Sequence, residues 1–213
     1  MNNSTAITLD HACDAIRCYP KRHDMTTAHA KRGFTLIELL ITLSIATILL
    51  TIAVPSFIDF IRNGRMATQT NDLVLALAYA KSEAVKRGTT INVCKNVDTT
   101  TACSNTDTGW SNGWTVFVDS DNDCVVDSTE EVLRIWTALQ ANTLCYSNGD
   151  RVRFGSTGFT TSVSNGTFRV CDARGATEAR GVVLSLQGRA RRATDSDNNS
   201  IEEDGSGNDL SCP

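Results

Sequence analysis

Hydrophobic residues along this chain follow three successive patterns. The first is a predominantly apolar run of 21 residues from Phe34 to Val54, in which only Glu38 is charged. A helix of this length can cross a hydrocarbon core of about 30 Å. A cleaved secretory signal is excluded because its apolar region is only about 7 to 15 residues long. The run therefore predicts a membrane-spanning helix over residues 34–54.

The second pattern, over residues 55–88, has the periodicity of an amphipathic helix. Its apolar residues recur at steps of three, four and seven, which places them on one helical face. Basic residues followed by Gly88 form a stop signal. We therefore expect one helix of 53 residues, Thr35–Arg87, with Pro55 and Gly64 as points of bend. The apolar face consists of Met66, Leu73, Leu77, Ala80 and Ala84.

The third pattern, over residues 89–213, consists of short β-type runs separated by clusters of Gly, Asn, Asp and Ser. The run 180–187 is apolar on both faces at its centre and should be the most buried strand. Together the patterns predict the α+β class: a long N-terminal helix packed on a β-rich C-terminal head of about 125 residues. The predicted strands are 90–95, 113–119, 131–136, 151–154, 166–171 and 180–187.

Charge sets the expected orientation and limits the partners. Lys21, Arg22, Lys31 and Arg32 precede the apolar run, so the positive-inside rule places the N-terminus in the cytoplasm and the head in the periplasm, after a single pass through the inner membrane. From residue 89 onward, ten Lys and Arg stand against seventeen Asp and Glu, a net charge of −7. This differs from a basic nucleic-acid-binding domain, so any contact with DNA must be local.

Six cysteines follow the apolar run, and an even number in an oxidising compartment favours three disulfides. Fifteen pairings are possible. We expect Cys94–Cys103 to close a short polar loop, Cys171–Cys212 to hold the C-terminal tail, and Cys124–Cys145 to follow by elimination. A zinc site is disfavoured because no two of these cysteines have Cys-x-x-Cys spacing.

Histidine is confined to the N-terminal segment. His11, His23 and His29 all precede Gly33, so the rest of the chain contains none. This excludes a histidine base and a histidine metal ligand there. We expect a non-enzyme that needs no cofactor.

An acidic segment over residues 119–130 matches part of a calcium-binding pattern. Asp119, Asp121 and Asp123 take its first, third and fifth places and Glu130 its twelfth. The sixth place, normally Gly, is Cys124. The flanking strands favour instead a hairpin whose Asp-rich and Asn-rich turn bonds its own backbone, so no metal is expected.

The residues at the start of the apolar run carry a more specific signal. Lys-Arg-Gly-Phe-Thr-Leu-Ile-Glu, within the segment Lys31–Ser56, closely resembles the N-terminal signature of type IV pilins and type II secretion pseudopilins. The resemblance implies that a prepilin peptidase cuts after Gly33 and methylates Phe34. It also implies that Glu38 pairs with the amino terminus of a neighbouring subunit. Such a partner would offset the cost of a membrane carboxylate, roughly 2.5 to 3.5 kcal/mol at the helix centre.

The same resemblance makes residues 1–33 a cytoplasmic leader that processing removes. This leader is longer than is usual for pilins. Met25 would start a leader of nine residues, so we expect it to be the initiator and residues 1–24 to be untranslated.

Parts of the head resemble the GspH/FimT branch of minor pilins, namely segments 113–119 and 154–159 and a last strand that ends in Gly-Arg. Gly188, Arg189 and Arg191 match the Gly-Arg-x-Arg motif by which FimT-type minor pilins bind DNA in natural transformation, and Arg192 would add charge. If the strand continues, Arg189 and Arg191 share a face about 6 to 7 Å apart, close to the spacing of phosphates on a DNA strand. The alternative is a solvated strand end that the acidic tail balances.

Three functions remain open at this point. The first is a minor type IV pilin at or near the pilus tip that binds the DNA backbone for uptake. The second is a structural pseudopilin that primes a type II secretion pseudopilus, and the third is a calcium-stabilised adhesin-like tip subunit. In each case the expected partners are other pilins or pseudopilins, the prepilin peptidase and the inner membrane.

Overall fold

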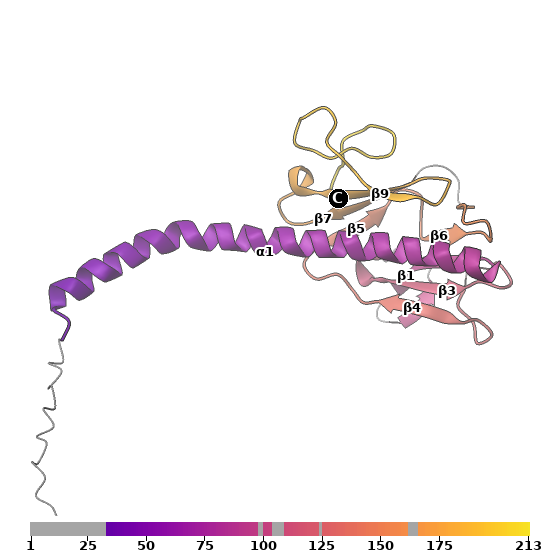
Figure 1. Ribbon diagram of the computed structural model, residues 1–213, viewed down its shortest axis with the longest axis horizontal. Helices are drawn as coiled ribbons and strands as arrows, with labels where there is room; N and C mark the ends of the chain where they lie inside the picture. The colour runs from indigo at the N-terminus through magenta and orange to yellow at the C-terminus, as the bar shows by residue number, and fades with distance from the viewer. Residues whose placement is uncertain (1–32, 98–99, 104–108, 124, 162–165) are drawn as a thin grey trace, which may run out of the picture. The chain divides into compact units, whose positions relative to one another are not determined.

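A single long helix is followed by antiparallel strands in two sheets (Figure 1). This confirms the predicted α+β class. The computed structural model describes residues 33–97, 100–103, 109–123, 125–161 and 166–213.

Helix α1, Leu36–Arg87, has 52 residues and is continuous through Pro55. At its start the Thr35 hydroxyl accepts a hydrogen bond from the Glu38 backbone N–H at 3.2 Å, which satisfies one free donor of the first turn. It ends before Gly88, whose φ is +65°. The predicted helix and its stop signal are therefore confirmed, with the start displaced by one residue.

The chain divides into two compact units between Leu49 and Leu50. Of the helices in the described part of the chain, α1 is long and apolar enough to cross a membrane, with a mean hydropathy of 2.4 over its most apolar stretch. The side chains of residues 33–49 are exposed throughout. The features described below lie in the second unit unless the first is named.

The first sheet is entirely antiparallel and is built around β1. β1 pairs with β3, and β3 with β4, while β2 and β6 both pair with β1. Its strands are β1 Ile91–Val97, β2 Thr100–Cys103, β3 Trp114–Val118, β4 Val132–Trp136 and β6 Arg151–Phe154, and a 3-10 helix, η1 Trp110–Asn112, precedes β3.

The second sheet has the order β5-β7-β8-β9 and is also antiparallel. β9 therefore lies at an edge. The strands are β5 Thr143–Tyr146, β7 Gly166–Cys171, β8 Arg180–Leu184 and β9 Ala190–Arg192, and the 3-10 helix η2, Ala176–Glu178, precedes β8.

The hydrophobic core joins one face of α1 to both sheets. All five residues of the predicted apolar face are buried, each at most 1% exposed. They belong to one cluster with Trp114 of β3, Phe154 of β6 and Phe168 of β7. Val183 of β8 points to the other side and packs in a second, smaller cluster with Leu210 of the tail. β8 is thus buried on both faces, as predicted.

Six of the observed strands were predicted, but the strand expected over residues 180–187 ends at Leu184. There the chain reverses and returns as β9, so the Gly-Arg-x-Arg motif lies on a turn and a second strand. The prediction that the motif continues the long strand is wrong. β2, β5 and β9, of three or four residues each, were not predicted.

The disulfide predictions have different outcomes. Cys171–Cys212 is confirmed. Cys124–Cys145 is wrong because Cys145 is a free thiol. The pairing was expected by elimination alone, which does not test whether two thiols can meet, and Cys145 lies in β5 of the second sheet.

Cys94 is disulfide-bonded. The side chain of Cys103 and all of Cys124 lie outside the described residues. Cys94–Cys103 therefore stays a prediction.

Candidate functional site

The turn between β8 and β9 explains why glycine occupies position 188. Gly188 is buried, has a φ of +69° and donates its backbone N–H to the Ser185 carbonyl at 2.9 Å. A Cβ on this residue would collide with the carbonyl oxygen of Gly158 and lie 3.1 Å from the Phe154 ring. Glycine is therefore required to reverse the chain immediately before Arg189.

The pairing of β9 with β8 directs Arg191 and Arg192 to opposite faces of the sheet. Arg192 is opposite Val182, a residue of the main core, and its Nη2 donates to Asn71 Oδ1 on α1 at 2.6 Å. Arg191 is opposite Val183, on the other face. Arg189 precedes β9, has no partner on β8 and lines a groove beside α1. The structure therefore directs Arg191 and Arg192 to opposite faces of β9 and places Arg189 just before the strand.

Arg189 and Arg191 are both exposed, and among the described residues neither forms an ion pair. Arg191 makes a single long hydrogen bond of 3.4 Å to the carbonyl of Arg192. Other arginines of the head form ion pairs with carboxylates, for example Arg174 with Asp172 at 2.7 Å. The guanidinium groups at positions 189 and 191 are thus available to an external anion.

A groove of about 770 Å³ lies beside Arg189, between α1 and the β8–β9 turn. Lys81 closes one part of it by donating its Nζ to the Gln187 carbonyl at 2.7 Å. None of its lining residues is acidic, and three are basic. The lining residues are Val74, Ala78, Lys81, Ser82, Val85, Lys86, Gln187, Gly188, Arg189 and Ala190.

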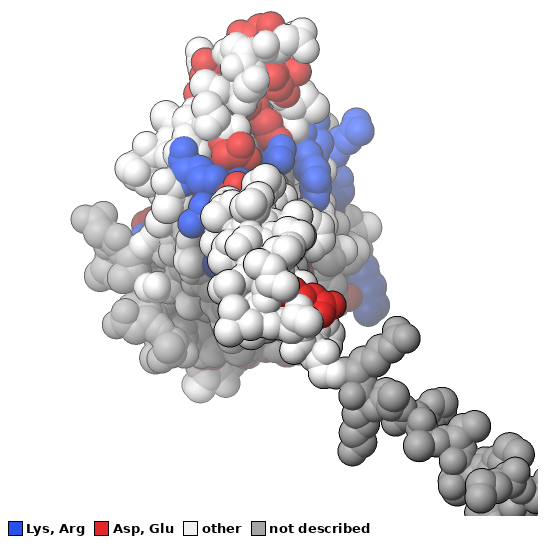
Figure 2. All heavy atoms as spheres, turned by 90° about the vertical axis from the view of Figure 1, so that its left-hand side faces the viewer, with Lys and Arg blue, Asp and Glu red and all other residues white. Residues whose placement is uncertain are grey.

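The acidic tail after β9 was expected, in the alternative interpretation, to balance the arginines. Two of its carboxylates instead bond their own segment: Asp195 accepts from the Asn198 N–H at 2.7 Å, and Glu203 from the Ser196 N–H at 2.8 Å. A third, Glu202, pairs with Arg180 of β8 at 2.9 Å. Acidic side chains gather at the top of the view where these loops lie, with basic side chains below them (Figure 2). Within the described residues the tail makes no ion pair with Arg189 or Arg191.

The hydrogen bond from the Ser196 backbone holds the pKa of Glu203 below its ordinary value, although burial opposes this effect. Glu203, Asp195 and Asp197 offer carboxylate oxygens within 4.8 Å of one another. No site was predicted at this group from the sequence, because its acidic residues were interpreted only as a charged tail.

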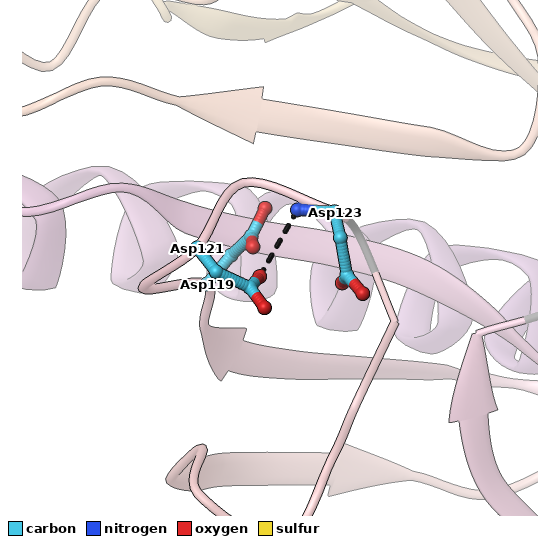
Figure 3. Close-up of side chains that lie close together, drawn as sticks. All are labelled: Asp119, Asp121 and Asp123. Carbon is cyan, nitrogen blue, oxygen red and sulfur yellow. Dashed lines mark hydrogen bonds between the residues drawn. The ribbon is translucent and has the colours of Figure 1, made fainter.

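The second predicted constellation lies in the loop between β3 and β4, which are antiparallel neighbours as expected. Asp119, Asp121 and Asp123 converge there, with one carboxylate oxygen of each within 4.8 Å of the others (Figure 3). The N–H of Asp123 donates to Asp121 Oδ1 at 3.1 Å, as the dashed line shows.

Asp119 is fully buried, and its two oxygens have different surroundings. Oδ2 accepts from Asn92 Nδ2 at 2.5 Å and from Arg153 Nη2 at 3.4 Å. Oδ1 has no hydrogen-bond partner among the described residues. Asn92 and Arg153 lie far from this loop in sequence, and no local signal could have identified them.

Glu130 approaches the same loop from its far end. Its Oε1 accepts from the Ser120 N–H at 2.8 Å, while Oε2 is buried without a partner among the described residues. Burial raises the pKa of Glu130, and the charges of Asp119, Asp121 and Asp127 raise it further, against the lowering effect of the Ser120 hydrogen bond.

The N-terminal site residues belong to the first unit. Gly33 and Phe34 precede α1 and are exposed, and Glu38 is in its first turn. The structure does not test their predicted roles in processing and assembly.

Two family models match the chain. The model described as type II transport protein GspH matches residues 69–188, and the prokaryotic N-terminal methylation motif matches residues 28–54. No curated protein sequence matches.

Solved structures with a similar fold include the type IV minor pilin FimU of Pseudomonas aeruginosa strain PAO1. It is 20% identical, with 63% of this chain and 92% of that chain covered and a TM-score of 0.50. The minor pseudopilin EpsH of the type 2 secretion system of Vibrio cholerae is 14% identical, with 62% and 99% covered and a TM-score of 0.44. At these identities, the likeness to FimU supports the fold alone.

Proposed function

Because the chain belongs to the GspH family and carries the N-terminal methylation motif, we propose that it is a minor type IV pilin whose head binds DNA through Arg189 and Arg191. Pilins and pseudopilins are structural proteins that assemble with one another, and the apolar N-terminal helix fits membrane anchoring followed by incorporation into a fibre. The DNA contact is the specific part of the proposal.

The N-terminal residues supply the assembly function. Prepilin peptidase removes residues 1–33 by cutting after Gly33, and Phe34 becomes the methylated terminus. Residues 34–54 hold the subunit in the inner membrane with the head, residues 89–213, in the periplasm. Glu38 then pairs with the terminus of a neighbouring subunit in the fibre. The methylation-motif match over residues 28–54 supports this sequence of events.

One observation carries the DNA proposal: Arg189, just before edge strand β9, and Arg191 within it are both exposed and, among the described residues, have no acidic partner. A guanidinium group binds phosphate in a forked, charge-assisted geometry that reads no sequence. Gly188 shapes the turn that presents the pair, and Arg192 contributes charge only, since its side chain contacts Asn71.

Salt-dependent binding of a labelled DNA duplex to the full chain in detergent tests the proposal. About three neutralised phosphates would give a slope of log affinity against log salt near −2.7, and losing two of them would reduce it to about −0.9. We expect the variant Arg189→Gln/Arg191→Gln to show that reduction. The matched control is Arg62→Gln/Arg134→Gln, which removes two charges elsewhere on the surface and should leave the slope unchanged.

An unchanged affinity and slope in Arg189→Gln/Arg191→Gln would contradict the DNA proposal. The alternative is then a structural pseudopilin that primes a type II secretion pseudopilus, which the description of the GspH model and the net charge of −7 on the head favour. A strain lacking the gene would in that case lose protein secretion and keep DNA uptake.

We propose no catalytic activity for either alternative. The chain after Gly33 contains no histidine, which removes the side chain that most often serves as a general base near neutral pH.

A further inference from the structure

We propose that the loop between β3 and β4 binds one Ca²⁺ through Asp119, Asp121, Asp123 and Glu130. This proposal is independent of DNA binding and of the choice between pilus and secretion system. It also reverses the expectation from sequence that the segment is only a polar turn.

The four proposed ligands have the spacing of a calcium-binding loop. They occupy the first, third, fifth and twelfth places of a twelve-residue segment, which are four of the ligand positions of an EF-hand loop. Spacing alone is weak, because Asp-rich turns are common and many bind nothing.

The carboxylates of the three aspartates are also close enough together to share an ion. One oxygen from each of Asp119, Asp121 and Asp123 lies within 4.8 Å of the others (Figure 3). With Ca–O bonds of about 2.3 to 2.6 Å, two ligands on opposite sides of one ion are about 4.6 to 5.2 Å apart. The separation of the three oxygens is therefore compatible with their binding one calcium ion.

The decisive observation is a buried acceptor that lacks a partner. Asp119 is 0% exposed, and Asn92 and Arg153 satisfy only its Oδ2. Its Oδ1 has no partner among the described residues, and neither does the buried Oε2 of Glu130. A buried, unpaired carboxylate oxygen is costly. A cation held by the three aspartates would give the Asp119 carboxylate a further partner, and Glu130, outside the group of oxygens within 4.8 Å, would complete the site by turning its unpaired Oε2 toward the ion.

The donor set selects the kind of cation. All four side chains offer carboxylate oxygens, which suit hard cations, whereas Zn²⁺ prefers nitrogen and sulfur ligands. Asp121 and Asp123 are exposed and lie on a loop, so the coordination is adaptable and open to water. Ca²⁺ accepts six to eight oxygens in flexible geometry, while Mg²⁺ requires a near-ideal octahedron and keeps several waters.

The site would join parts of the head that are distant in sequence. The Asp119 N–H donates to the Thr90 carbonyl at 3.1 Å, at the start of β1, and Arg153 of β6 donates to the Asn122 carbonyl at 3.0 Å. A bound ion would therefore brace the β3–β4 loop against two other strands of the first sheet.

The acidic group in the tail does not support the same conclusion. Both oxygens of Glu203 accept hydrogen bonds from the Ser196 N–H, at 2.8 and 2.9 Å. Its buried carboxylate is therefore satisfied, unlike that of Asp119. Because Asp195 and Asp197 repeat the spacing of two of the proposed ligands, this group provides a matched control.

Equilibrium dialysis of the full chain in detergent against radioactive Ca²⁺ tests the site. We expect one ion per chain, with a dissociation constant of about 10⁻⁴ to 10⁻³ M, the range of extracellular calcium modules. Asp121→Asn/Asp123→Asn should weaken binding at least tenfold. These residues are exposed, so the variant is expected to fold. Asp195→Asn/Asp197→Asn should bind calcium as the parent does.

A melting experiment provides a second measurement of the same site. About 5 mM calcium should raise the melting temperature of the parent chain but not that of Asp121→Asn/Asp123→Asn, because a ligand stabilises only the state that binds it. The proposal is overturned if the parent chain binds no calcium, if Asp121→Asn/Asp123→Asn binds it as well as the parent, or if magnesium binds equally tightly.

Discussion

At the scale of single residues, Gly188 determines how the two arginines are presented. We expect Gly188→Ala to lower the free energy of unfolding by about 2 to 5 kcal/mol. A left-handed conformation costs a non-glycine residue roughly 1 to 2 kcal/mol, and the clash of the new Cβ with the Gly158 carbonyl adds about 1 to 3 kcal/mol. Denaturant unfolding of the full chain in detergent measures the change.

Gly88 is the control for this prediction. It has nearly the same φ, +65° against +69°, but no atom within 4 Å of an added Cβ. Gly88→Ala should therefore cost only about 1 to 2 kcal/mol. If both variants lose the same stability, the close approach to Gly158 is not what requires glycine in the turn.

Sequence could predict a site residue only where its role depends on residues close to it along the chain. The Gly-Arg-x-Arg motif was identified from adjacent residues, but the shared face of Arg189 and Arg191 stays a prediction, because Arg189 precedes β9 and has no partner on β8. The contact of Arg192 with Asn71 joins residues 121 positions apart. It could not be predicted, because it depends on how β9 packs against α1.

At the scale of elements, strong local signals identified α1 and the buried strands. The apolar periodicity ending at Gly88 predicted the helix to within one residue. β2, β5 and β9 were missed because each has only three or four residues and little alternation. Such strands are defined by their neighbours in the sheet, and a single sequence does not show these.

The C-terminal tail is an element whose order should depend on pH. Because the pKa of Glu203 is lowered in the folded state, its carboxylate stabilises the tail above the ordinary value of about 4.3. That stabilisation is lost as the pH falls through the lower, folded value. We expect backbone amides near Ser196 to lose protection from hydrogen exchange between pH 7 and pH 3, after correction for the intrinsic rate.

Glu203→Gln tests whether Glu203 causes this pH dependence of the tail. This variant should already be less protected at pH 7 and change less on acidification. Protection that survives to pH 3 in the parent chain would show that the disulfide Cys171–Cys212 and the packing of Leu210 hold the tail without Glu203.

At the scale of the whole molecule, the proposed DNA contact requires the acidic head to separate its positive contact from its negative surroundings. The head carries a net charge of −7, so repulsion opposes the approach of DNA at long range. The repulsion extends over roughly one Debye length, which is about 30 Å at 0.01 M salt and about 8 Å at 0.15 M. The acidic tail is the negative charge nearest to the arginines in sequence, since Asp195 follows Arg191 by four residues. Four residues of extended chain span at most about 14 Å.

Neutralising part of the tail should therefore strengthen DNA binding at low salt only. We expect Asp195→Asn/Asp197→Asn to raise the affinity for a DNA duplex about threefold at about 0.01 M salt, with the gain disappearing near 0.15 M as screening removes the repulsion. Asp121→Asn/Asp123→Asn removes the same charge from a loop on the other sheet and should have a smaller effect, measured in chelator so that calcium does not contribute. Equal gains from the two variants would mean that the repulsion is spread over the whole head, and that DNA does not approach preferentially at the arginines of β9.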